Sequence, residues 1–328
     1  MQENPIPLQH VAQPILYDSL PLKSRVRLAY HVTYLADGNS LSLPCLILVG
    51  RSHRPRLSCV ALVHGNEPEG MIALYELWHE LDVEKLDGTV VIVPVANPPA
   101  FRAGMRRNPE DQIDMNRICP GKPDGNTTEQ LAYHLLHGIV AGSDLLLSTH
   151  GFTGDAVVVP YTEYPKGIQV TDASRMAARA FGLEYIEDYD WFYGDLANAA
   201  TRMGIPGIEP EIGGLGITTP EGVALYKRGI LNLLKHLGIL PGKPEIPRQV
   251  RHINHTYLYA PTGGVIRRHL ELRDQVHIGD RIMTITDLFG EPLAEIISPK
   301  EGFIGVQRLQ ASVNPGELVG VIFQLRDD

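Results

Sequence analysis

Two histidines in this sequence stand where an apolar run ends, and each is followed by glycine. His64 follows the run 57–63, and His150 follows the run 145–149. Glu67 comes three residues after His64, so a turn can bring its carboxylate to the imidazole. Catalytic zinc takes three nitrogen or oxygen ligands and keeps a fourth position for water. These side chains therefore predict a Zn²⁺ site, with one ion per chain.

Such a site needs a base that takes a proton from water, and two glutamates qualify. Glu209 and Glu211 lie in the segment GIEPEIGG, two residues apart, so on a strand they face the same side. Paired like charges raise the pKa of one partner. A solvated edge strand is the alternative, and the apolar and glycine neighbours disfavour it.

The segment 101–117 is rich in arginine, although the protein as a whole is acidic. The planar guanidinium group matches a carboxylate, and Asn116 adds an amide donor. Acidic residues are interleaved, so a solvated loop with internal ion pairs is an equal alternative. The four arginines are Arg102, Arg106, Arg107 and Arg117.

The elements that must position these side chains alternate between strand and helix patterns. Residues 57–63 and 89–98 contain near-continuous apolar runs, typical of strands covered on both faces. Residues 71–81 have helical spacing, and the helix-like segment 221–237 stops before Gly238. Further strands are expected at 25–35, 42–50, 144–151 and 204–214, and further helices at 129–140 and 172–182. This alternation predicts an α/β fold with a mostly parallel or mixed sheet flanked by helices. Both histidines then lie at the carboxyl ends of strands, where such sheets bind ligands.

A proline-rich linker, residues 241–247, separates this region from a different pattern. Beyond it, short strands alternate with glycine and proline turns, and no helical period is present. The sequence therefore predicts two domains, an α/β domain over residues 1–245 and a small all-β domain over residues 246–328.

The composition limits the partners and the compartment. The chain has 328 residues, 44% of them hydrophobic, and a net charge of −9, which disfavours nucleic acids and anionic membranes. Three cysteines without a CxxC pair fit a reducing compartment. The N-terminus lacks a signal-peptide pattern, and no apolar run reaches about 18–20 residues. We expect a cytoplasmic protein that binds a small molecule, with homo-oligomerisation left open.

Four motifs in order resemble the succinylglutamate desuccinylase/aspartoacylase family, which is grouped with the zinc carboxypeptidases. They are HGNEPEG, RNPEDQIDMNR, SDLLLSTHG and IEPEIGG. The resemblance covers about residues 20–240, and a small β domain after it is typical of bacterial members. It implies a carboxypeptidase-like zinc hydrolase that cleaves the amide of an N-acylated amino acid.

The resemblance also implies roles for individual residues. By position, His64, Glu67 and His150 match the metal ligands. Glu211 matches the base that takes the proton of water and passes it to the leaving amine. Glu69 does not have the spacing of a ligand. Two other functions share the site: a metallocarboxypeptidase acting on short peptides, and a metal-free protein that senses a small acid.

The arginine-rich segment matches the family's D-x-N-R motif. Asn116 and Arg117 match the pair that binds the substrate carboxylate. An upstream arginine polarises the scissile carbonyl in the family. Arg107 aligns best with it, and Arg106, one residue away, remains an alternative.

Three positions depart from the family pattern. Ser148 replaces an aspartate two residues before the third ligand, which predicts weaker support of that histidine. Glu209 replaces a threonine and adds a carboxylate near the substrate or the metal. Cys119 replaces a phenylalanine, which we interpret as a change of packing.

Residues 246–328 resemble a biotinyl or lipoyl carrier domain. Such domains present a lysine at a hairpin tip, and the corresponding turn here, residues 287–292, contains none. We therefore expect no covalent cofactor, and a role as a lid, in packing or in oligomerisation.

Overall fold

The computed structural model describes residues 6–152, 154–167, 169–190 and 194–326. Its largest sheet has 13 strands in the order β1-β2-β3-β5-β4-β6-β9-β7-β8-β10-β17-β15-β12. The first part of this sheet consists of β1 (Leu8–Val11), β2 (Ser24–Tyr34), β3 (Ser40–Val49), β5 (Thr89–Val93), β4 (Arg56–Val60), β6 (Leu145–Ser148) and β9 (Gly207–Gly214). Strands β5, β4, β6 and β9 are parallel to one another. Strand β3 runs antiparallel to both of its neighbours, β2 and β5. The protein is thus α/β with a mixed sheet.

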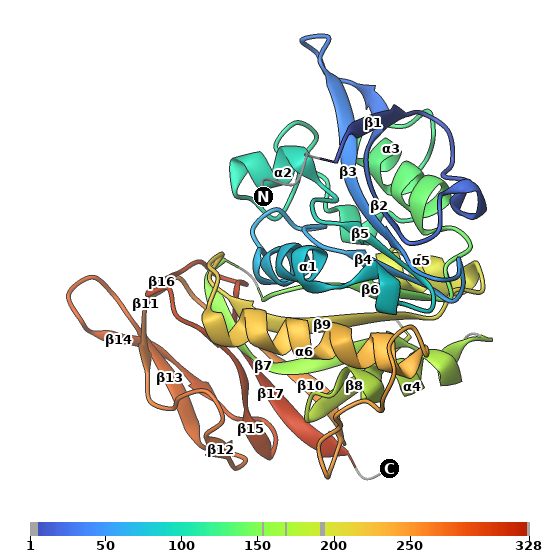
Figure 1. Cartoon of the computed structure of the whole chain (residues 1–328). Coiled ribbons are helices and arrows are strands. Elements are labelled where there is room, and N and C mark those ends of the chain that lie inside the picture. Colours follow the sequence, from blue (N-terminus) through green and yellow to red (C-terminus); the bar gives the residue numbers. More distant parts are fainter. Residues whose placement is uncertain (1–5, 153, 168, 191–193, 327–328) are drawn as a thin grey trace.

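Helices cover both faces of this part of the sheet. On one face lie α1 (Glu69–Glu80), α4 (Thr171–Phe181) and α6 (Pro220–His236), and Figure 1 shows α1 and α6 side by side across the strands. On the other lie α3 (Thr127–Tyr133), the π-helix His134–Val140 and α5 (Leu196–Arg202). The remaining short helices are Tyr17–Ser19, Val83–Lys85, α2 (Pro98–Ala103) and Met115–Arg117. Among the described residues, no helix combines the length and the apolar character needed to cross a membrane.

Burial on both faces explains the apolar runs. All five residues of β4 and all five of β5 are buried, because each strand lies between two helical layers. The helix expected over 71–81 is α1, which begins two residues earlier. The helix expected over 129–140 changes from α to π geometry at His134.

The second part of the large sheet curls into a closed ring of strands. It contains β7 (Ala156–Pro165), β8 (Tyr185–Tyr189), β10 (Arg251–Tyr259), β17 (Leu318–Arg326) and β15 (Gly302–Arg308), and β12 (Gln275–Val276) extends its edge. The ring closes because β15 also pairs with β7. An apolar cluster that includes Tyr161, Phe303 and Phe323 fills it.

The C-terminal region is all-β, as expected, but it does not stand apart. Strand β10 pairs with β8, and β15 pairs with β7, so the linker near residue 245 does not separate two sheets. A smaller sheet of β14 (Pro292–Ile297), β13 (Arg281–Thr286), β11 (Gly264–Arg268) and β16 (Ser312–Val313) projects to one side of the ring (Figure 1). The turn 287–292 joins β13 to β14 and exposes Leu288 and Phe289 to solvent.

Candidate active site

Two neighbouring parallel strands bring the predicted ligands together. Strand β4 ends four residues before His64 and β6 two residues before His150, and the register pairs Val60 with Ser148. The chain after β4 then turns sharply into α1. Gly65 is required in this turn, since a Cβ atom there would lie 2.1 Å from the carbonyl carbon of Ala100.

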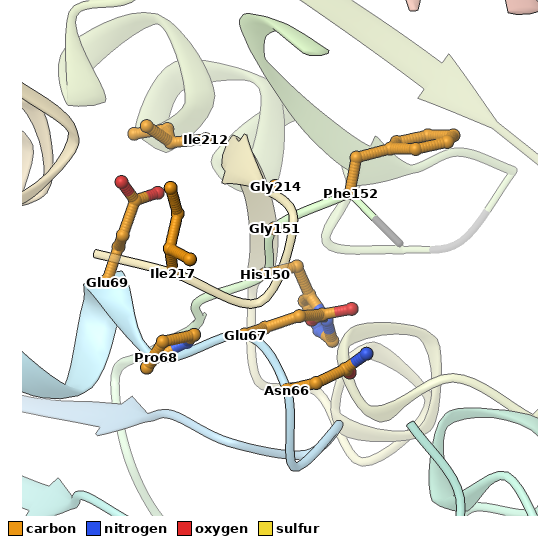
Figure 2. A pocket seen from close by; sticks show the side chains of 10 residues that line it. All are labelled: Asn66, Glu67, Pro68, Glu69, His150, Gly151, Phe152, Ile212, Gly214 and Ile217. Carbon is orange, nitrogen blue, oxygen red and sulfur yellow. Dashed lines mark hydrogen bonds and ion pairs between the residues drawn. The ribbon is translucent and has the colours of Figure 1, made fainter. Parts of the chain in front are cut away.

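The three predicted ligands form one buried group. Nδ1 of His64 lies 2.9 Å from Oε1 of Glu67, and Nδ1 of His150 lies 3.0 Å from Oε2 of the same carboxylate. The two Nδ1 atoms are 3.2 Å apart. Figure 2 shows Glu67 and His150 side by side, with Glu69 directed away from them. All three ligand atoms lie within 4.8 Å of one another, as required to hold a metal ion.

Each histidine is held from behind through its other ring nitrogen. Asp114 Oδ1 lies 3.0 Å from Nε2 of His64. Ser148 Oγ lies 2.9 Å and Glu209 Oε1 3.4 Å from Nε2 of His150. Contacts of this kind fix the orientation of a ligand histidine. Ser148 thus reaches the ring with its hydroxyl, and Glu209 adds a carboxylate at the same nitrogen. That Ser148 supports the histidine more weakly than an aspartate stays a prediction.

The charges in this group stabilise one another. Burial opposes ionisation of Glu67, but His64 and His150 hold its pKa far below the usual range. Burial also opposes the charge of His150, but Glu209 and Glu67 raise its pKa well above the usual value. A group that holds a proton this strongly between a carboxylate and two imidazole rings suits a divalent cation, which binds once that proton is released.

Glu209 and Glu211 occupy different environments, although both lie on β9. Glu209 is 3% exposed and contacts His150 and the amide of Asn116. Oε2 of Glu211 is buried and has no hydrogen-bond partner among the described residues. Burial and the charge of Glu67 raise the pKa of Glu211 well above its usual value. Glu211 therefore combines a carboxyl oxygen without a partner among the described residues with a raised proton affinity, as a group that transfers protons requires.

Arg106, and not Arg107, contacts the ligand group. Its Nη1 lies 3.4 Å from Oε1 of Glu67, and its Nε donates to Oδ2 of Asp114 at 2.9 Å. Burial disfavours the charge of Arg106, but Glu67 and Asp114 raise its pKa. Arg107 is exposed and lines the cavity.

Asn116 and Arg117 lie in the short helix Met115–Arg117 and line the same cavity. Oδ1 of Asn116 accepts a hydrogen bond from the amide of Leu196 at 2.8 Å, which fixes the side chain. Arg117 is exposed, and its Nη1 donates to the carbonyl oxygen of Asn116 at 2.8 Å. Cys119, one turn further on, is buried in the core.

A cavity of about 890 Å³ joins these groups and reaches the ring of strands. The sequence did not single out several of the residues that line it. These are Asp114, Tyr161, Glu163, Glu187, Tyr189, Asp195, Tyr257 and Tyr259. Asp114 lies within the D-x-N-R motif, so the motif could have identified it. The others lie on β7, β8 and β10 or just before α5, and no motif marks them.

This geometry accompanies a clear relationship to known proteins. Residues 53–237, more than half of the chain, match the succinylglutamate desuccinylase/aspartoacylase catalytic domain. The chain belongs to this family of deacylases.

Particular relatives extend the similarity beyond that domain. The chain is 31% identical over 290 residues to the N-alpha-acetyl-L-2,4-diaminobutyric acid deacetylase of Halomonas elongata, covering 85% of this chain and 84% of the relative. It is 26% identical to the product-bound ectoine utilization protein EutE (DoeB) of Ruegeria pomeroyi, with a TM-score of 0.85 over 93% of this chain and 97% of that one. A succinylglutamate desuccinylase/aspartoacylase of Rhodobacter sphaeroides also has 26% identity and a TM-score of 0.85, over 94% and 98% of the two chains.

Proposed function

We propose that this chain is a zinc-dependent deacylase that cleaves the amide of a small N-acylated amino acid. One observation carries the proposal. The buried group of His64, Glu67 and His150 lies beside Glu211, whose buried Oε2 has no partner among the described residues. Metal ligands next to a carboxyl oxygen without another partner are the parts that hydrolysis of an amide requires.

The chemistry divides among few groups. When bound, a zinc ion polarises a carbonyl oxygen and lowers the pKa of a water molecule. Glu211 takes the proton of the attacking water and delivers it to the nitrogen of the leaving amine. The guanidinium of Arg106, fixed by Glu67 and Asp114, donates to the oxygen on which negative charge develops. We therefore assign to Arg106 the role that the family motif favoured for Arg107.

Other residues of the same cavity bind the amino-acid part of the substrate. Arg117 offers a guanidinium fork to the substrate carboxylate, and Asn116 holds the loop in place through Leu196. Glu209, placed by sequence among the substrate contacts, serves instead to orient His150. The relative from Halomonas elongata is named for an N-acetylated diamino acid, and we propose a substrate of the same kind.

Metal analysis and a substrate panel test the proposal. Purified without chelator, the protein should contain about one zinc ion per chain, and His64→Ala should lose it, whereas His277→Ala, at an exposed position, should retain it. The zinc-loaded protein should hydrolyse N-acetylated amino acids. Turnover of dipeptides alone would indicate a carboxypeptidase. Protein without zinc, even after zinc is added, would indicate a binding protein.

A further inference from the structure

A second cluster of titratable groups lies beside the catalytic cavity. Glu163 on β7, Glu187 on β8 and His255 on β10 bring polar atoms within 4.8 Å of one another. Both glutamates line the same cavity as Glu211. The hydrolysis described above gives none of the three a role.

The strand register places carboxyl groups directly opposite one another. Glu163 pairs with Glu209 of β9 on one side and with Glu187 of β8 on the other. Like charges in such cross-strand positions destabilise a sheet. Burial and this repulsion raise the pKa of Glu163 to about 7 and that of Glu187 to about 9. Ionising this row of carboxyl groups, Glu209, Glu163 and Glu187, is therefore unfavourable unless a positive group lies among them.

The immediate partners of these glutamates do not supply that charge. Oε1 of Glu163 accepts a hydrogen bond from the hydroxyl of Tyr161 at 2.6 Å. Oε2 of Glu187 lies 3.0 Å from Nδ1 of His255. Burial lowers the pKa of His255 to about 3, so its ring is neutral near neutral pH. Both contacts orient the carboxylates without neutralising them. The charge of Arg117 lowers the pKa of Glu163, and the charges of Arg326 and Lys166 lower that of Glu187, but burial has the larger effect on both.

The same cavity is also lined by a buried carboxyl oxygen without a hydrogen-bond partner among the described residues. Asp195 is 2% exposed and lines the cavity, and its Oδ2 has no hydrogen-bond partner among the described residues. Tyr189 joins it to the row, since its hydroxyl lies 2.9 Å from Oδ1 of Asp195 and 3.4 Å from Oε2 of Glu209. An unpaired buried acceptor is costly, and it indicates a ligand that carries N–H or O–H donors.

The cavity is lined by both basic and acidic side chains. Its lining contains three arginines, Arg106, Arg107 and Arg117, together with the carboxyl groups of Glu163 on β7 and Glu187 on β8. The rings of Tyr161 on β7 and Tyr257 on β10 line the same cavity, and aromatic faces attract organic cations. A molecule that carries a carboxylate at one end and an ammonium group at the other matches this distribution.

We propose that Glu163 and Glu187 form a subsite for an ammonium group on the side chain of the substrate, so that the enzyme selects N-acylated diamino acids. This inference rests on the deacylase function proposed above. Neighbouring strands lie about 4.8 Å apart, so β8 is about 10 Å from β9, which carries Glu211. A short amino side chain can therefore reach between β7 and β8 while the amide lies at Glu211.

Two substrates that differ in side-chain charge test the subsite. We compare kcat/KM for N-α-acetyl-2,4-diaminobutyrate with that for N-acetylnorvaline, its neutral isostere. Wild-type protein should favour the cationic substrate by about 30-fold or more, as expected for hydrogen bonds to a charged group. Glu163→Gln and Glu187→Gln should reduce this preference to about threefold or less. Glu184→Gln, an exposed position beside β8, should retain it. Circular dichroism and thermal melting verify that each variant is folded.

Other outcomes overturn the inference in recognisable ways. A preference that persists in both variants would exclude the subsite. A second zinc ion per chain that is lost in Glu187→Gln would instead identify a second metal site. If wild-type protein hydrolyses no N-acylated amino acid, the deacylase function fails, and calorimetry with free 2,4-diaminobutyrate decides on the subsite alone. Binding that Glu187→Gln loses and Glu184→Gln retains would support it, and equal binding or no binding would refute it.

Discussion

Ser148 Oγ lies 2.9 Å from Nε2 of His150, while Nδ1 of the same ring faces Glu67 at 3.0 Å. The carboxylate of Glu209 approaches the same Nε2 at 3.4 Å. A proton on Nε2 is thus held by a hydroxyl and a carboxylate, which leaves the lone pair of Nδ1 free for a metal ion. A serine on β6 and a glutamate on β9 together provide this support.

The charge of Glu209 should matter more for metal affinity than the hydroxyl of Ser148. We expect Glu209→Gln to weaken zinc binding by about 10–100-fold, the usual effect of removing such a partner. Ser148→Ala should weaken it by less than about tenfold, because the carboxylate remains. Competition with a chromogenic chelator measures both, with Glu221→Gln, exposed on α6, as a control. Wild-type affinity in both variants would contradict this arrangement.

Glu211 should be required for the reaction and not for metal binding. Because it is the proposed base, Glu211→Gln should lower kcat by about 10²–10⁴ while the zinc content stays at the wild-type level. Glu69→Gln is a poor control, since Glu69, the first residue of α1, accepts hydrogen bonds from Thr219. Glu221→Gln is better, because it is exposed. A near-normal rate in Glu211→Gln would direct attention to Glu209.

The two adjacent arginines should behave differently. Arg106→Ala removes the donor beside Glu67, so kcat should fall by about 10²–10³, as when an oxyanion donor is lost. Arg106→Lys should recover only part of this activity, because an ammonium group lacks the planar fork. Arg107→Ala provides the matched control and should lower kcat by less than about tenfold. A larger loss in Arg107→Ala would restore the assignment that the sequence favoured.

Arg117 should act on substrate binding more than on the chemical step. Arg117→Ala should raise KM about tenfold or more for substrates with a free carboxylate, because bidentate contacts with a carboxylate are strong, while kcat changes little. The matched comparison is the carboxamide of the same substrate, for which KM should be nearly the same in both proteins. An equal loss with the carboxamide would mean that Arg117 has another role.

The grouping of His64, Glu67 and His150 was predictable from sequence because local patterns define it. His64 and Glu67 lie in one turn, and buried parallel strands before His64 and His150 force both to the same edge of the sheet. The assignment of Arg106 was not predictable in this way. Two adjacent arginines fit the same motif, and only the direction of the loop brings one of them to Glu67.

The sequence did not predict the acidic residues Glu163 and Glu187 as part of the cavity, because it did not predict strands β7 and β8. The sequence of β8, YIEDY, has adjacent charged residues, and β7 contains Pro160 and ends at Pro165, which weakens a strand pattern. The polar side chains of these strands face a cavity instead of a core. Their pairing with β10 and β15 joins segments far apart in the sequence, and periodicity does not show such pairings.

Stability should fall as pH rises because of Glu187. Its pKa is about 9 in the folded protein, owing to burial and the nearby Glu163, against 4.5 for an unperturbed glutamate. Between these values the folded state keeps a proton that the unfolded state releases, so the free energy of unfolding decreases as pH increases. Glu187→Gln removes this titration. The free energy of unfolding of the variant minus that of wild-type protein should therefore increase by more than about 1 kcal/mol from pH 5 to pH 9. Urea denaturation across this range measures the difference, and Glu184→Gln should run parallel to wild type. If Glu187→Gln also ran parallel to wild type, Glu187 would be ionised in the folded protein throughout, and the repulsion across β7 and β8 would be relieved by another group.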